Sequence, residues 1–428
     1  MADCCGGEDG EASERGLSAR GARIAGGAEG LLHKGFDLYL RDPFDADHNP
    51  QGILNFGTSE NKLCFDLIQD RFTKPDMYYL EPDLLRYSDT QGIKRFREEI
   101  AKFLTIYAKA PTALDPEHII VMNGCCAAFA TLSVVLCDPG DGYLIPAPYY
   151  GGLNSKTWLY GEMQPVHVPL FSEVTDEKSQ PFQLTIEKLE TALQRAEEQG
   201  IRVRALILIN PHNPLGDIYP AKLLKECLEF AHRYKLHVIM DEIYMLSVYD
   251  DTTFTSILSL DRILACVASE LEYYIPKIMR SGKLLIDWLS FMDALDLCNM
   301  FSANSLATEF LKSQTFEAEI ELWWKILNEK ILISPGKAFC CYEPGWFRLV
   351  FSDSLDNISL CIQRLQQMLC KQMDELIPIS SSAVENESTE SDEDESTESD
   401  DEPSANYINT SVDDASDGYS HLKKIAVF

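Results

Sequence analysis

The chain has 428 residues and a formal net charge of −31, and 45% of its residues are hydrophobic. This size allows two globular domains with large cores. The charge argues against a nucleic-acid or anionic-membrane surface, and no apolar run approaches the 18 residues of a membrane span. The 13 cysteines have no regular or metal-site spacing, which is typical of a reducing compartment. We therefore expect a cytoplasmic protein that holds no metal and binds no nucleic acid and no membrane.

The first 262 residues contain the clearest secondary-structure pattern. Residues 1–30 are rich in Gly, Ala and Glu, which predicts a disordered N-terminal tail, and residues 31–75 are assigned to the first part of a small domain. Residues 76–262 alternate strands and helices, which indicates an α/β fold with a doubly wound, mostly parallel sheet. In chain order, we expect helices at 63–72 and 93–107, a strand at 118–122, a helix at 128–136, strands at 142–146 and 165–170, and a helix at 184–198.

A strand–helix–strand unit follows, with predicted strands at 205–209 and 237–240 and a helix at 221–234. Polar residues follow the strand ends, with Asn213 after the first and Asp241 and Tyr244 after the second. Ligands of open α/β sheets bind at that edge. An amide, a carboxylate and a phenol could together hold a planar heteroaromatic ring, with the carboxylate on a protonated ring nitrogen. The alternative is a generic turn with a strand-end carboxylate.

Two motifs in this unit carry a family resemblance. Asn-Pro-His-Asn-Pro-Leu-Gly at 210–216 and Asp-Glu-Ile-Tyr at 241–244 resemble motifs of the fold-type I, class I/II aminotransferases, which use pyridoxal 5′-phosphate (PLP). The resemblance implies a PLP cofactor, an amino-acid substrate and a homodimer. It also implies that Asp241 holds the pyridine nitrogen and that Asn213 and Tyr244 bind the ring oxygen.

The segment at 55–62, Asn-Phe-Gly-Thr-Ser-Glu-Asn-Lys, resembles the 1-aminocyclopropane-1-carboxylate (ACC) synthase branch and its animal homologues. On that likeness Glu60 would face the substrate, whereas the alternative is an ordinary turn before a helix. In the family, the loop at 87–92 crosses the dimer interface and delivers an aromatic hydroxyl to the partner's cofactor phosphate. Thr90 stands at that position here, so this contact is weakened or lost, and Tyr87 is a candidate substitute.

Small residues after the strand at 118–122 predict an anion site at a helix N-terminus, because backbone N–H groups point outward there. By resemblance, Gly124, Cys125, Cys126 and Ala127 would cradle the cofactor phosphate, although Ala127 lacks the hydroxyl usual in the family. The alternative is that small residues merely permit close helix–strand packing.

The Pro-Ala-Pro-Tyr-Tyr segment at 146–150 resembles a family segment in which a tyrosine stacks on the pyridine ring. We favour Tyr150 over Tyr149 for this role. The alternative is that both rings belong to the core or to the pocket wall.

The family pattern breaks after Asp250. The expected Ser-x-Ser-Lys, whose lysine forms the Schiff base with PLP, and the following Gly-x-Arg are both missing, so no catalytic residue is identified. Lys277, Lys283 and Lys337 are possible substitutes, but none follows a Ser-x-Ser approach. We expect residues 263–379 to form a truncated remainder of the large domain and the C-terminal small domain, with residues 271–297 mostly helical.

The pattern resumes at 316–348, where Arg348 matches the arginine that grips the substrate's α-carboxylate. The alternative for Arg348 is a surface salt bridge. Residues 380–428 contain 14 acidic residues and two lysines, which predicts a disordered tail that is either phosphorylated or simply solubilising.

Three functional hypotheses follow. The leading one is a PLP-binding, ACC synthase-like protein acting on an amino acid, although the missing lysine counts against turnover. The second is a noncatalytic pseudoenzyme or isoform that pairs with intact family subunits. The third is a misfolded product without function.

Overall fold

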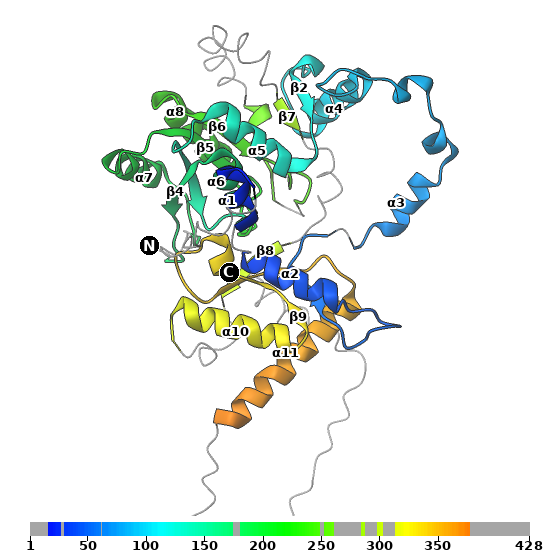
Figure 1. Cartoon of the computed structure of the whole chain (residues 1–428), viewed down its shortest axis with the longest axis vertical. Helices are drawn as coiled ribbons and strands as arrows, with labels where there is room; N and C mark the ends of the chain where they lie inside the picture. The colour runs from blue at the N-terminus through cyan, green and yellow to red at the C-terminus, as the bar shows by residue number, and fades with distance from the viewer. Residues whose placement is uncertain are drawn as a thin grey trace, which may run out of the picture.

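The structure is a computed structural model that describes residues 16–26, 30–60, 62–173, 180–248, 252–260, 284–286, 298–302 and 313–376. Its elements form two lobes, which lie one above the other in Figure 1. Residues 1–15 and the predicted acidic tail, 380–428, lie outside the described residues. So do most of the residues that follow the break in the family pattern.

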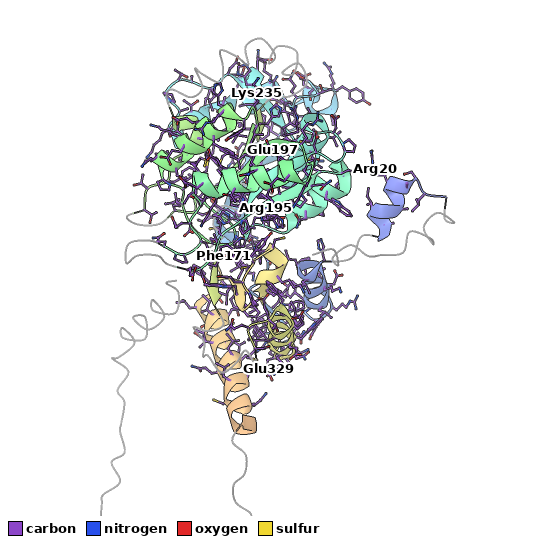
Figure 2. All side chains as sticks on the ribbon, turned by 90° about the vertical axis from the view of Figure 1, so that its left-hand side faces the viewer. Arg20, Phe171, Arg195, Glu197, Lys235 and Glu329 are labelled. Atoms are coloured by element: carbon purple, nitrogen blue, oxygen red, sulfur yellow. The ribbon has the colours of Figure 1, made fainter. Side chains whose placement is uncertain are left out.

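The large lobe is built around a four-stranded parallel sheet in the order β4-β3-β5-β6. The strands are β3 (Gly142–Ala147), β4 (Gln164–Pro169), β5 (Val203–Ile209) and β6 (His237–Asp241). The helices that pack on this sheet are α5 (Gly124–Leu136), α6 (Gly152–Gly161), α7 (Ile186–Glu198) and α8 (Ala221–Arg233). Figure 2 shows α7 from outside, with Arg195 and Glu197 on it.

The large-lobe sheet is buried on both faces, as an unalternating run of apolar residues in a strand predicts. Leu206 and Leu208 of β5 pack with residues of α7 and α8 on one face. Ala205, Ile207 and Ile209 pack with residues of α5 and α6 on the other face. The predicted doubly wound α/β sheet is therefore confirmed.

A second part of the large lobe adjoins the sheet. Strand β2 (Ile119–Val121) pairs in parallel with β7 (Leu284–Ile286), and helix α4 (Lys94–Tyr107) packs beside β2. The helical prediction for residues 271–297 is wrong at β7, because pairing with β2 supplies these residues with backbone partners that local sequence does not reveal. The rest of 271–297, up to the start of β8 (Cys298–Ser302), lies outside the described residues.

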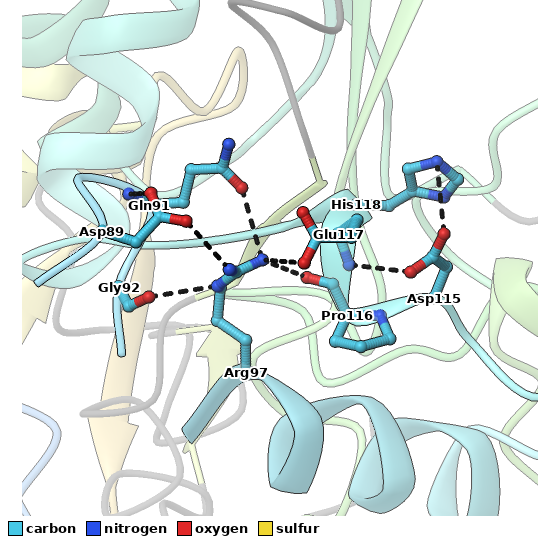
Figure 3. A network of polar contacts seen from close by, with 8 residues as sticks. All are labelled: Asp89, Gln91, Gly92, Arg97, Asp115, Pro116, Glu117 and His118. Carbon is cyan, nitrogen blue, oxygen red and sulfur yellow. Dashed lines mark hydrogen bonds and ion pairs between the residues drawn. The ribbon is translucent and has the colours of Figure 1, made fainter. Parts of the chain in front are cut away.

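Arg97 of α4 is almost fully buried and ties the turn at residues 89–92 to the 3-10 helix η4 (Pro116–His118). Its guanidinium donates to the carbonyl oxygens of Gly92 at 3.1 Å and Pro116 at 2.7 Å. It also bonds the carboxylate of Asp89 at 3.1 Å, and Figure 3 shows these contacts together. Arg97 thus fixes the end of the segment that contains Thr90.

The small lobe brings together residues from both ends of the described chain. Its helices are α2 (Leu31–Arg41), α10 (Phe316–Asn328) and α11 (Leu355–Leu376). Strand β1 (Leu54–Asn55) pairs in parallel with β9 (Ile331–Leu332), and β10 (Ser334–Pro335), β11 (Trp346–Val350) and β8 form an antiparallel sheet in the order β10-β11-β8. Trp323 lies in the core between these elements and donates its indole N–H to the Ile333 carbonyl oxygen at 2.8 Å.

An extended arm joins the lobes and projects from the body of the molecule on the right of Figure 1. We define the arm as residues 62–92. It contains α3 (Phe65–Phe72) and the 3-10 helices η2 (Pro75–Tyr78) and η3 (Pro82–Leu85). Most of its side chains are exposed, including large apolar ones such as Tyr79 and Leu85.

Three local features differ from the predicted elements. Helix α1 (Ala19–Gly26) lies in the predicted N-terminal tail, because Ser18 accepts the Gly21 N–H and starts a helix there. Helix α6 was not expected, since its sequence has no apolar face by itself. Helix α5 begins at Gly124, earlier than the predicted start at residue 128. Among the described residues, no helix is long and apolar enough to span a membrane, and no three His, Cys, Asp or Glu side chains gather as metal ligands would.

Candidate functional site

The carboxyl ends of β5 and β6 lie side by side, as the sequence predicts. Ile209 pairs with Asp241, and the Asn210 N–H donates to the Asp241 carbonyl oxygen at 2.8 Å. The buried Asn210 side chain holds the loop that follows, because its Oδ1 accepts the Tyr219 N–H at 2.9 Å. Asn210 is therefore a structural residue that shapes the loop carrying Asn213.

Asn213 and Tyr244 meet at this edge of the sheet. The Asn213 amide donates to the Tyr244 hydroxyl oxygen at 3.0 Å, and both side chains are buried. Asp241 lies at the end of β6, and one of its carboxylate oxygens, Oδ1, accepts the Ile243 N–H at 3.2 Å. The predicted amide, phenol and carboxylate thus belong to one region of the molecule.

Arg348 reaches this region from β11 of the small lobe. Its guanidinium donates to Asn213 Oδ1 at 3.2 Å and to the Gly57 carbonyl oxygen, and it stacks on the Phe339 ring at 4.7 Å. Only 3% of Arg348 is exposed, its Nε has no hydrogen-bond partner, and the described residues place no carboxylate within ion-pair distance of it.

A buried cation without a counter-charge is unfavourable. The planar guanidinium with an unused N–H is suited to receive a carboxylate. The surface salt bridge considered for Arg348 is therefore wrong for the described residues.

Tyr150 lies close to the residues described above. Burial raises its pKa, and the charges of Cys126, Arg348 and Asp241 also act on its hydroxyl. Tyr149 is different, since its side chain is completely buried and its hydroxyl donates to Asn154 Oδ1 at 2.5 Å. This geometry agrees with the preference for Tyr150 as the residue that faces a ligand.

The N-terminus of α5 also borders Tyr150. Gly124, the first residue of α5, has a φ of 85°, a conformation that glycine adopts readily. Cys125 and Cys126, in the same turn, are among the groups whose charges raise the pKa of Tyr150. Asn123 at the N-cap makes no side-chain hydrogen bond to this helix, and the backbone N–H groups at a helix N-terminus favour an anion. Ala127 adds no hydroxyl, and only backbone donors are present.

The remaining predicted residues are not part of this cluster. Glu60 lies near Tyr39 of α2, whose pKa is raised by burial and then by the Glu60 charge. Thr90 and Tyr87 are exposed on the arm. Lys337 is exposed and its ammonium lies 5.8 Å from the Phe316 ring, whereas Lys277 and Lys283 lie outside the described residues.

Sequence reasoning missed three features of the site. The Gly57 carbonyl oxygen and the Phe339 ring hold Arg348, and only the tertiary fold brings them together. Glu242 of the Asp-Glu-Ile-Tyr motif accepts the Ser256 hydroxyl at 2.6 Å and the Ile257 N–H at 2.7 Å. Burial raises the pKa of Glu242 to about 7, and its two hydrogen bonds join the motif to residues 256–257. The presence of Glu242 in the motif was the available signal.

The donor set fits the ring and the carboxylate expected of a PLP-dependent site. Asp241 can pair with a pyridine nitrogen, Tyr244 and Asn213 can bond a ring oxygen, and the unsatisfied Arg348 can receive a carboxylate. The phosphate would rely on the backbone N–H groups at the start of α5. The described residues include no lysine bonded to any of these side chains.

Comparisons with known proteins agree with the geometry. Residues 53–281 match the family described as aminotransferase class I and II. The chain is 40% identical over 421 residues to 1-aminocyclopropane-1-carboxylate synthase-like protein 1 of Bos taurus, covering 82% of this chain and 83% of that protein. It is 38% identical to the human probable inactive 1-aminocyclopropane-1-carboxylate synthase-like protein 2, covering 85% and 75%.

Solved structures share the fold. The N-succinyldiaminopimelate aminotransferase of Mycobacterium tuberculosis matches with a TM-score of 0.57 and 18% identity, over 81% of this chain and 99% of that one. An archaeal alanine:glyoxylate aminotransferase matches with a TM-score of 0.58 and 18% identity, over 84% and 99%.

Proposed function

Because the chain belongs to the class I and II aminotransferases, in the ACC synthase-like branch, we propose that it binds PLP and an amino acid between its two lobes. Members of this family depend on PLP. The observation that carries the proposal is the buried Arg348, which contacts Asn213 and has an unsatisfied Nε. Such a guanidinium is poised for a carboxylate beside the expected ring position.

Each side chain has a role in this proposal. Asp241 holds the protonated ring nitrogen, while Asn213 and Tyr244 bond the ring oxygen. Tyr150 covers the ring, and Arg348 orients the amino acid through its α-carboxylate. When bound, PLP supplies an electron sink for reactions at the amino acid's α-carbon.

A second candidate function is that of a noncatalytic family member. One specific observation favours it, namely the absence of the Ser-x-Ser-Lys segment from the sequence. The site retains groups that bind and orient ligands, but the amine that would exchange with the substrate and carry its α-proton is missing. On this proposal the pocket binds its ligands without turning them over.

An absorbance titration of the purified full chain with PLP tests both candidates. A visible band that borohydride abolishes, leaving the cofactor covalently attached to the chain, would indicate a reactive lysine and support the enzyme. Quenching of tryptophan fluorescence without such a band would support noncovalent binding. Asp241→Asn should weaken binding in either case, whereas Asp83→Asn, an exposed control on the arm, should not. Absence of binding by the native chain would overturn the PLP proposal.

We also propose that a second copy of the chain covers the arm. Its exposed apolar side chains include Tyr79, 72% exposed, and Leu85, 84% exposed, and burying them would be favourable. The family resemblance of the loop at 87–92, the last part of the arm, supports a homodimer. Sedimentation of the native chain and of Leu85→Glu tests this, because the charge should shift the protein to the monomer. A native monomer would refute it.

A cytosolic location is proposed as well. It is supported by the absence of disulfides among the described cysteines. Fractionation of cells expressing the tagged chain tests the location.

A further inference from the structure

A chain of polar contacts joins the two lobes directly beside Tyr150. His167 of β4 bonds the Tyr149 hydroxyl through Nε2 at 3.0 Å and the Tyr342 hydroxyl through Nδ1 at 3.1 Å. Its ring also packs nearly edge-on against both tyrosine rings, with centroid distances of 5.4 and 5.8 Å. Tyr149 and His167 belong to the large lobe, whereas Tyr342 precedes β11 of the small lobe.

The direction of each hydrogen bond in this chain can be assigned. The Tyr149 hydroxyl donates to Asn154 Oδ1, so it accepts from His167 Nε2–H. The His167 Nδ1 is then an acceptor, and Tyr342 donates to it. The Asn154 amide in turn donates to Cys340 Sγ at 3.4 Å, which returns the chain to the small lobe. Every member has a partner when His167 is neutral, and burial lowers the His167 pKa to about 4.

Hydrogen bonds from large-lobe backbone N–H groups also hold the same small-lobe segment, residues 338–343, against the large lobe. The Tyr149 N–H donates to the Phe339 carbonyl oxygen at 2.9 Å, and the Ser172 N–H donates to Glu343 Oε2 at 3.0 Å. Gly151 approaches so closely that an added Cβ would lie 1.9 Å from the Ala338 carbonyl oxygen. Phe171, at the lower edge of the large lobe in Figure 2, packs on Tyr342.

Residues next to these interlobe contacts belong to the candidate site. Tyr150 follows Tyr149 directly, and the Phe339 ring supports the Arg348 guanidinium at 4.7 Å. A small displacement between the lobes would therefore change the distance from the ring position at the large lobe to the carboxylate position at Arg348.

We propose that His167 is a positioning residue, which joins Tyr149 to Tyr342 and thereby fixes the relative position of the two lobes at the candidate site. The inference rests on the proposed function for its ligands, but the interlobe contact itself does not. A merely structural role would lower stability without changing how the two halves of the site cooperate.

The test compares two probes that differ by one carboxylate-bearing group. Pyridoxamine 5′-phosphate occupies the ring position alone, and N-(5′-phosphopyridoxyl)alanine also carries the carboxylate that Arg348 would receive. Calorimetry with the full chain gives their affinity ratio for the native protein, for His167→Phe and for Tyr342→Phe. Thr105→Val is the matched control, because it removes a hydroxyl of α4 that accepts the Leu114 N–H at 3.0 Å within the large lobe, outside this chain of contacts.

We expect His167→Phe and Tyr342→Phe to lower the affinity for the alanine adduct by about tenfold while leaving that for pyridoxamine 5′-phosphate within about twofold. Thr105→Val should leave the ratio unchanged. Equal losses for both probes, or an unchanged ratio, would overturn the proposal.

Hydrogen exchange separates this proposal from the proposed function. Amides at residues 338–343 should exchange faster in Tyr342→Phe and His167→Phe than in Thr105→Val. If the native chain binds neither probe, the proposed function fails, and the exchange result alone decides on the positioning role. Unchanged exchange at 338–343 in both variants would overturn that role.

Discussion

Glu319 offers a direct test of how the small lobe holds Arg348. It lies in the first turn of α10 with none of its surface exposed. Its Oε1 accepts the Lys337 N–H at 2.8 Å, and its Oε2 accepts the Gly345 N–H at 2.6 Å. These contacts fix both ends of the segment between β10 and β11. We predict that Glu319→Gln removes a large part of the pH dependence of stability near neutral pH.

The magnitude of this pH dependence of stability follows from the pKa of Glu319, which burial raises from 4.5 to about 7. The folded state then binds the proton more tightly than the unfolded state. Its contribution to stability is fully present below pH 4.5 and is lost as the pH rises through 7. The difference between the two pKa values corresponds to about 3 kcal/mol. Glutamine has one oxygen, so one buried N–H loses its acceptor, which costs about 1–3 kcal/mol at low pH.

Urea unfolding monitored by tryptophan fluorescence between pH 5 and 8 measures this effect. The native chain should lose about 2.5 kcal/mol more than Glu319→Gln across this range, since pH 5 already lies above the unfolded pKa. The two should become similar in stability at pH 8. Glu321→Gln, an exposed substitution on the same helix, is the control. Glu242, also buried, contributes to both curves, so only their difference counts. Parallel curves for the native chain and Glu319→Gln would refute the reasoning.

Three further predictions concern binding and stability. Arg348→Leu should weaken binding of N-(5′-phosphopyridoxyl)alanine by about 2–4 kcal/mol, measured by calorimetry, because the charged donors to its carboxylate are lost; an unchanged affinity would contradict the assignment. Ser256→Ala should raise the pKa of Glu242 above about 7 and lower stability by about 1 kcal/mol, seen as a shift in pH-dependent unfolding. Leu206→Ala in the buried sheet should cost about 2–5 kcal/mol, whereas an exposed Leu40→Ala should stay within about 0.5 kcal/mol in the same unfolding assay.

The hydrophobic pattern of a segment predicted its secondary structure wherever the pattern alone records how that segment is buried. The strand at 205–209 and the helix at 221–234 were predictable because an unalternating apolar run and a 3.6-residue period record two-sided and one-sided burial. The cluster of Asn213, Asp241 and Tyr244 was predictable too, since parallel strands bring their carboxyl ends to one edge.

Other features required contacts between segments far apart in the chain. β7 forms where the sequence suggested helix, because it completes a pair with β2. Helix α1 begins at Ser18 in a stretch whose composition resembles a tail. Amino-acid composition and hydrophobic periodicity describe the average burial of a segment. They do not reveal a single helix-capping residue or a strand partner that is distant in the sequence.

The sequence by itself determined the fold class, the family and the chemical types of the groups proposed to bind ligands, because these depend on short-range periodicity and on motifs at strand ends. It also determined that the lysine motif is absent. Only the tertiary structure decided that Arg348 is buried on Asn213, Gly57 and Phe339, and that His167 joins the lobes. Apart from the Arg348–Phe339 contact, these contacts link residues more than a hundred positions apart. Their energies depend on desolvation and geometry that exist only in the folded chain.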